Sequence, residues 1–321
     1  GVALRRTLEA GMKTLPLMAL FFLPIVVGMH FLFEWTHADV VAHDPVLQAK
    51  AFYLNEKFFL VRAVLYFAIW FVVAAALSRW SLVQDDEPSP RIDRRLHFWS
   101  RGGLALYALT MTFASVDWAM SLEPHWYSHI YGVIVIGGQI LTAMMFAIVI
   151  AVRLAKMPKV GEFMNAERFH DFGKLLLAFI MLWAYFALSQ FLIIWSANLP
   201  EETPWYLTRR EGGWQVLAVA LILLHFVAPF AILLSRHVKR TPAVLGTVVL
   251  ALLFMRFVDL YWLVAPSFQG PKLSPHWLDV TTMAAIGGIW VAAFVRLLKP
   301  HPVLPLNDRY YQLAELEEEG A

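Results

Sequence analysis

The sequence predicts an all-α protein, a polytopic bundle of transmembrane helices with its N and C ends on the cytoplasmic side. Three observations predict it: an apolar composition, a series of long apolar stretches, and basic residues sorted between alternate loops. Of 321 residues, 60% are hydrophobic and 16% are charged, whereas soluble domains have about 45–50% apolar and about 25% charged residues. A chain this apolar must bury most of its length in lipid.

Eight stretches are long enough to be spans, because a hydrocarbon core of about 30 Å needs about 20 apolar residues per helix. They cover 14–33, 58–77, 102–120, 129–152, 172–197, 214–235, 242–263 and 277–298. Unbroken apolar runs of this length exclude barrel strands. We therefore predict one helical bundle domain over 1–298 and a cytoplasmic acidic tail over 299–321. The charged, Pro-rich stretch from Gln84 to Arg95 is predicted to be a solvated loop.

Lys and Arg set the predicted orientation. Eighteen of them lie in one set of loops, which includes both ends of the chain, and only five lie in the opposite set. Cytoplasmic loops carry the excess of basic residues, so the first set is predicted to be cytoplasmic. We expect a multi-pass protein of the bacterial inner membrane. Many Trp and Tyr residues lie at the outer ends of the predicted spans, which is typical of an interfacial aromatic belt.

Ionisable residues inside the predicted spans suggest function, because each is costly in hydrocarbon. Arg256 and Asp259 lie three apart on one helical face. They form either a structural clamp between helices or a proton-loadable pair. Arg62, Asp117 and Asp279 lie at a similar outer depth. Each of these alone fits a side chain that reaches the interface, whereas their clustering favours a functional site.

His225 lies near the centre of its predicted span, and Pro229 removes the amide donor that its carbonyl would use. The pattern predicts a kink and a proton relay, since histidine titrates near neutral pH; the alternative is a histidine bonded to a neighbouring helix. Asp171 lies at the cytoplasmic start of the predicted span 172–197, and Tyr185 and Gln190 follow along it. They line an inner half-channel or belong to an ordinary helix start. The predicted proton path thus comprises Asp117, Arg62, Arg256, Asp259, His225, Asp171, Tyr185 and Gln190.

No intrinsic cofactor or metal is expected. The chain has no cysteine, which excludes disulfides and cysteine-ligated zinc or iron–sulfur clusters. A b-type haem needs paired axial ligands, and His225, His30 and His129 form no pair at matching depth. The net charge of +2 is too small to suggest nucleic acid as a partner.

Several strings are unusually specific. Residues 115–132 read SVDWAMSLEPHWYSHIYG, residues 189–206 read SQFLIIWSANLPEETPWY, and the first part of the chain contains RRTLEA, LPLM and FFLVR, the last ending at Arg62. Together they resemble the ActF-type membrane subunit of alternative complex III, a quinol:cytochrome c oxidoreductase. That subunit belongs to the NrfD-like, or polysulfide-reductase, membrane family. The resemblance covers nearly the whole chain.

The resemblance implies a ten-span family member, of which this chain shows eight; two N-terminal helices are then missing here or naturally absent. It implies a cofactor-free subunit that supports assembly, with proton translocation as a candidate role. The implied partners are a sister NrfD-like quinol-binding subunit, an iron–sulfur subunit, haem c subunits, other small membrane subunits and lipid. The residues of this chain that match the family's motifs and would share their roles are Asp117, Glu123, His125, His129, Asn198, Glu201, Glu202 and Arg62.

Two alternatives remain open from the sequence. A quinol-binding redox subunit of the same kind of complex would hold a quinol such as menaquinol, with Asp117, His129 or Arg256 bonded to its head group. An independent secondary transporter would show inverted repeats and broken helices, of which the sequence offers only proline kinks.

Overall fold

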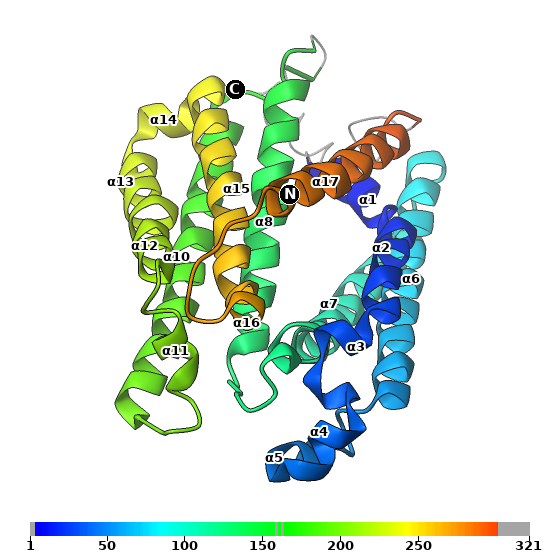
Figure 1. Ribbon diagram of the computed structural model, residues 1–321. Helices are drawn as coiled ribbons and strands as arrows, with labels where there is room; N and C mark the ends of the chain where they lie inside the picture. The colour runs from blue at the N-terminus through cyan, green and yellow to red at the C-terminus, as the bar shows by residue number, and fades with distance from the viewer. Residues whose placement is uncertain (1–3, 158–159, 162–163, 301–321) are drawn as a thin grey trace. The chain divides into compact units, whose positions relative to one another are not determined.

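The computed structural model describes residues 4–157, 160–161 and 164–300. Its elements are helical throughout these ranges, which confirms the all-α prediction (Figure 1). Seven helices are long and apolar enough to cross a membrane, as expected of a multi-pass membrane protein. They are Arg5–Val27, Glu56–Asp86, Tyr131–Leu154, Ala166–Ala197, Trp214–Leu234, Pro242–Val264 and Trp277–Leu298.

The predicted span at 102–120 falls in α7 (Pro90–Trp118), which is not one of these seven. At 29 residues α7 is long enough, about 44 Å. Its polar residues lower the hydropathy of every window, however; they include Arg101, Tyr107, Thr110, Ser115 and Asp117. The eighth span and the sidedness of the two ends therefore stay predictions.

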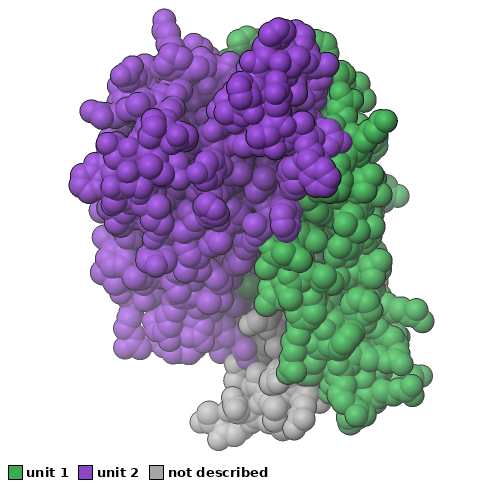
Figure 2. All heavy atoms as spheres, turned by 90° about the horizontal axis from the view of Figure 1, so that it is seen from below, with its two compact units in different colours: residues 1–32, 56–111, 276–321 green, residues 33–55, 112–275 purple. Residues whose placement is uncertain are grey.

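The chain divides into two compact units (Figure 2). Unit 1 comprises residues 1–32, 56–111 and 276–321, and unit 2 comprises residues 33–55 and 112–275, so the boundary falls within α7. The predicted bundle domain, 1–298, covers both units. Of the predicted tail, 299–321, the part from 301 onward lies outside the described residues.

Unit 1 contains α1 (Arg5–Met12), α2 (Leu15–Val27), α3 (Met29–Leu32), α6 (Glu56–Asp86), most of α7 and α17 (Trp277–Leu298). Helix α2 packs on α6, where the Phe22 and Phe59 rings stack at 6.4 Å. Helix α17 contacts α1, and the Trp290 indole donates to the Thr14 hydroxyl at 2.8 Å. The predicted loop Gln84–Arg95 is wrong: α6 continues to Asp86 and α7 begins at Pro90, leaving only residues 87–89 between them.

Unit 2 is built around α8 (Tyr131–Leu154), which packs on both α10 (Ala166–Ala197) and α15 (Pro242–Val264). Its membrane core consists of fully buried apolar side chains, among them Leu141, Met145, Ile148, Leu176, Ile180, Leu245 and Val249. The shorter elements are η2 (Glu34–Thr36), α4 (Ala38–His43), α5 (Pro45–Lys50), η3 (Met120–Leu122), α11 (Pro204–Thr208), α14 (Arg236–Arg240) and α16 (Pro266–Gln269).

The span at 214–234 is not a uniform α-helix. Between α12 (Trp214–Ala220) and α13 (Ala228–Leu234), the seven residues Leu221–Val227 form a π-helix, η4. Pro229 has no N–H to continue the α-helical ladder at His225, and the widened turn lies at the place where the sequence predicts a kink. Short π-helical segments occur frequently at functional sites.

Candidate functional site: a buried polar cluster in unit 2

Arg256 and Asp259 form a buried ion pair on α15, as their three-residue spacing predicts. The two residues are 4% and 8% exposed, and Nη1 of Arg256 donates to Oδ2 of Asp259. The same Asp259 oxygen accepts a hydrogen bond from Nε1 of Trp183 on α10 at 3.1 Å. A carboxylate held in this way is compensated by charge and by a second donor, which a buried ion pair requires.

Gly138 on α8 provides the space for the Arg256 guanidinium. A Cβ at Gly138 would lie 2.1 Å from Nη2 and 2.3 Å from Cζ of Arg256. Such distances are far inside van der Waals contact, so a side chain here would require the guanidinium to move from its present position. Three helices therefore meet at the pair: α8 with Gly138, α10 with Trp183, and α15 with the two charges.

His225 joins this cluster from the π-helix. It is fully buried, and its ring lies edge-on to that of Trp183, with centroids 4.4 Å apart and an interplanar angle of 83°. Neither ring nitrogen has a hydrogen-bond partner among the residues that the structure describes. Trp183 thus contacts His225 through its ring and Asp259 through its N–H. An unsatisfied buried polar group costs about 1–3 kcal/mol, and such exceptions call for an explanation.

Gln190 extends the polar face of α10 beyond Trp183. It follows Trp183 by seven residues, two helical turns or about 10 Å, and both are buried. Its Oε1 accepts from the Ser128 hydroxyl at 3.1 Å, and its Nε2 donates to the Tyr206 hydroxyl at 3.4 Å. Burial raises the pKa of Tyr206 to about 12, so this phenol stays neutral. Gln190 therefore lies at the end of α10 near the 119–130 and 198–213 loops.

The opposite half of the bundle is apolar. Between His225 and the start of α10, the fully buried side chains of α10 are apolar: Ile180, Leu176 and Phe169. Asp171 is exposed and bonded to Lys174 at 3.0 Å, and Tyr185 is 63% exposed. The structure does not gather Asp171, Tyr185 and Gln190 into one inner segment, because they lie at different depths along α10, and Asp171 and Tyr185 are exposed whereas Gln190 is buried.

The remaining predicted residues lie elsewhere. Asp117 is fully buried near the end of α7, where its backbone carbonyl accepts from the Ser121 hydroxyl at 2.5 Å. Arg62 belongs to unit 1, is 6% exposed and lies 4.3 Å over the Phe58 ring. His129 is exposed in the 119–130 loop.

Asp279 has a structural explanation. It is the third residue of α17, and its Oδ2 accepts from the backbone N–H of His276 at 2.9 Å, while the His276 ring accepts from Leu278 N–H. This reciprocal capping satisfies amides that have no partner inside the helix. Its position at the end of a predicted span thus reflects where α17 begins.

From the sequence, Arg209 is one of the five basic residues in the less basic set of loops, where an exposed side chain is expected. In the structure it is 2% exposed, within unit 2. Its Nη2 donates to Glu123 at 3.0 Å and to the Leu263 carbonyl at 2.9 Å, and its guanidinium lies 3.6 Å over the Trp205 ring. Burial lowers the pKa of Arg209, and the Glu123 carboxylate opposes this shift. The many tryptophans in the two loop strings were the feature of the sequence that could have indicated a buried cation here.

Those tryptophans are only partly an interfacial belt. Trp195 and Trp277 are 68% and 67% exposed, in keeping with that prediction. Trp126 and Trp205, by contrast, are buried and stack at 4.9 Å within the core of unit 2. The strings that carry the family resemblance therefore build a packed aromatic cluster around Arg209.

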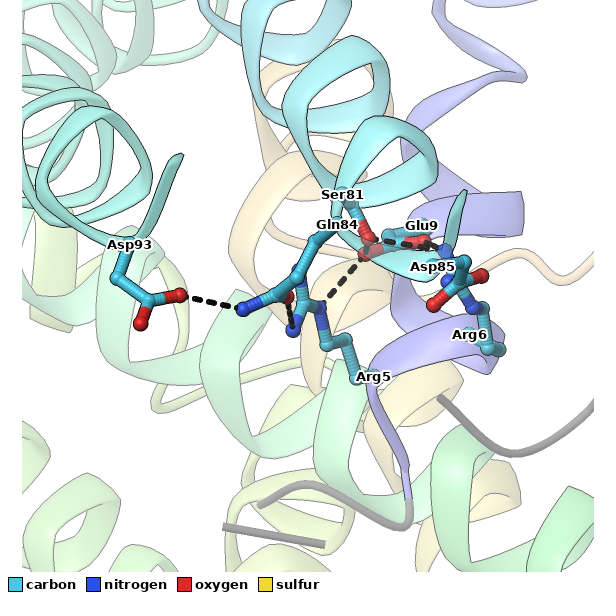
Figure 3. Close-up of polar contacts among 7 residues, drawn as sticks. All are labelled: Arg5, Arg6, Glu9, Ser81, Gln84, Asp85 and Asp93. Carbon is cyan, nitrogen blue, oxygen red and sulfur yellow. Dashed lines mark hydrogen bonds and ion pairs between the residues drawn. The ribbon is translucent and has the colours of Figure 1, made fainter. Parts of the chain in front are cut away.

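Unit 1 contains a second polar cluster, which the sequence did not predict (Figure 3). Arg6 on α1 is 3% exposed and donates to Glu9 at 2.5 Å, to Ser81 at 2.9 Å, and to Asp85. Arg5 bonds to Glu9 and to Gln84, and Gln84 donates to Asp93 of α7 at 2.7 Å. The network joins α1, α6 and α7 where the sequence suggests solvated loops.

No protein-family model matches the chain, and no curated protein matches it either.

Proposed function

We propose that the chain is a cofactor-free membrane subunit of a respiratory quinol-oxidising complex of the alternative complex III type, located in the bacterial inner membrane. The loop strings Ser115–Gly132 and Ser189–Tyr206 support this role, and the series of apolar helices is consistent with it. The partners are those that the resemblance implies: a sister quinol-binding subunit, an iron–sulfur subunit and haem c subunits.

Within that role, the Trp183–His225–Asp259 cluster takes up protons. The observation that carries the proposal is His225, a fully buried imidazole with two unsatisfied nitrogens in a π-helix, in contact through Trp183 with a buried ion pair. A neutral imidazole accepts a proton on its free nitrogen. The carboxylate of the cluster, Asp259, already balances Arg256, so a proton on His225 adds a net positive charge and is held there only in passing.

The polar side chains favour entry from one end. Ser128 and Tyr206, from the loop segments, contact Gln190 two turns from Trp183, whereas the part of α10 just beyond His225 buries the apolar side chains Ile180 and Leu176. This arrangement is a half-channel that ends at His225. Transfer to the other side of the membrane would need this apolar part to open.

Co-purification in mild detergent tests the assembly role. A tagged chain should be recovered with haem c and iron–sulfur subunits, and the chain separated from them should show no Soret band. Recovery of the chain alone from a membrane that contains the complex would contradict the proposal, as would a stoichiometric haem in the isolated chain.

Proton uptake is tested with two His→Leu variants. His225→Leu should leave assembly and quinol oxidation intact but lower proton translocation in proteoliposomes. His129→Leu is the matched control, because it makes the same replacement at an exposed position, and it should translocate like wild type. Equal translocation by both variants would refute the half-channel; failure of His225→Leu to assemble would favour a purely structural cluster.

Neither alternative gains a specific observation. The Arg256 guanidinium is enclosed by Asp259 and Gly138, and His129 is exposed in a loop, so their contacts do not converge on one quinone head group. If His129→Leu or Asp117→Asn lowered quinol oxidation itself, the quinol-binding role would be favoured.

Orientation has its own test. A reporter fused after Ala321 should indicate a cytoplasmic location, and a reporter inserted near Pro204 should indicate a periplasmic one. The opposite result would place the polar half-channel on the cytoplasmic side.

A further inference from the structure

Helix α14 is a short basic segment at one membrane face of unit 2. It lies between two helices that are able to span the membrane, Trp214–Leu234 and Pro242–Val264, and its sequence is RHVKR. Figure 1 shows it at the end of the bundle where α13 ends and α15 begins, and it packs on α10. A basic segment confined between two spans lies at the depth of lipid head groups.

The side chain of Lys239 on α14 packs into a notch on α10. A Cβ at Gly173 would lie 2.5 Å from Cγ, 2.9 Å from Cβ and 3.0 Å from Cδ of Lys239. The aliphatic stem therefore fills the notch that Gly173 leaves, and the whole residue is only 7% exposed. Its ammonium has no ion pair with any residue in the described ranges. This is a lysine held in a fixed direction, unlike a surface lysine that is free to reorient.

His170 lies one turn before Gly173 on the same face of α10. It is 6% exposed, and its Nδ1 is buried without a hydrogen-bond partner in the described part of the chain. The charged groups close enough to act on its ring are Lys174, Lys239, Glu167 and Arg236. Of these groups Glu167 is bonded to Arg240 and Lys174 is bonded to Asp171, which leaves Lys239 and Arg236 as the cations without a carboxylate of their own in the described residues. The site is therefore rich in donors and carries a local excess of positive charge.

We propose that this site, formed by Lys239, His170 and Arg236, binds the phosphate of an anionic phospholipid. A phosphate diester offers acceptor oxygens to the ammonium, guanidinium and imidazole donors. The neighbouring surface fits lipid tails, because Leu234 and Val244, on the helices α13 and α15 that flank α14, are large apolar residues and are 58% and 38% exposed. Head-group donors above exposed aliphatic side chains match a lipid better than a free anion.

The test measures lipid binding to the purified full-length chain by native mass spectrometry, with phosphatidylglycerol and phosphatidylcholine as probes. Lys239→Gln keeps the stem in its notch but removes the charge, and should weaken phosphatidylglycerol binding at least about five-fold. Lys156→Gln is the matched control, since it removes an exposed basic residue at the end of α8. That variant should bind like wild type, and phosphatidylcholine should bind all three proteins equally weakly.

A second pair of variants separates the site from a folding defect. Lys239→Arg keeps the charge and should retain most binding, whereas Gly173→Ala displaces the stem and should lose it. Equal effects of Lys239→Gln and Lys156→Gln would mean only a general attraction to an anionic surface and would overturn the proposal. Displacement of the lipid by inorganic phosphate at equal concentration would identify a free-anion site and would overturn it as well.

Discussion

Gly138→Ala should destabilise unit 2 by displacing Arg256 from Asp259. The added Cβ would lie 2.1 Å from Nη2 of Arg256, so the guanidinium must move by more than about 1 Å to restore ordinary contact. Breaking a buried pair costs about 3–5 kcal/mol when a charge is left unpaired. Alanine offsets about 1 kcal/mol of this through its better helix propensity. The net loss of unfolding free energy should be about 2–4 kcal/mol.

The assay is reversible unfolding in mixed detergent micelles, followed by the fluorescence of the tryptophans. Gly246→Ala is the matched control: this glycine is also buried in a spanning helix, but a Cβ there would meet Val152 no closer than 3.5 Å. It should be neutral or stabilising by up to about 1 kcal/mol. Equal stability of the two variants would refute the reasoning.

A double background sharpens this test. With Arg256 and Asp259 both replaced by Leu, the obstacle to a Cβ at Gly138 is removed, so Gly138→Ala should become neutral or slightly stabilising. Interaction between contacting residues appears as non-additivity in such a cycle. An undiminished loss in the Leu/Leu background would show that the alanine acts through some other contact.

Three further predictions concern the other polar contacts. Arg209→Lys should cost about 2–4 kcal/mol in the same unfolding assay, because one ammonium cannot reproduce the several directed bonds of the guanidinium; a loss below about 0.5 kcal/mol would contradict it. Glu9→Gln should cost about 1–3 kcal/mol by weakening the buried partner of Arg6, and added salt should hardly change that loss. The hydrogen bond from His125 lowers the pKa of Asp44, so the stability it contributes is present above the unfolded pKa of about 3.9 and is lost as pH falls through the lower folded pKa. As the pH is lowered through that range, the hydrogen-exchange protection of residues 33–55 should decrease in the wild-type protein. Asp44→Asn should remove this pH dependence. The same pH profile in both proteins would refute the prediction.

The sequence predicts well those features of the fold and the site that depend only on residues near one another in the chain. A run of about 20 apolar residues must become a helix in lipid, because only a helix satisfies its backbone there. Seven of the eight predicted spans correspond to helices of sufficient length and hydropathy. The pairing of Arg256 with Asp259 follows from helical periodicity, since residues three apart share a face. The π-helix at His225 likewise lies where Pro229 interrupts the backbone ladder.

Contacts between helices were decided only by the tertiary structure. Periodicity places a residue on a face of its own helix but leaves open the rotation of that helix and the choice of its neighbours. Gly138 and Arg256, 118 residues apart, meet because α8 packs on α15. For the same reason only the tertiary structure shows the contacts of Gln190, which is buried near the end of α10 and bonded to Ser128 and Tyr206. Helix length and local pairing are properties of the chain alone, whereas a site made by several helices exists only once their packing fixes which faces meet.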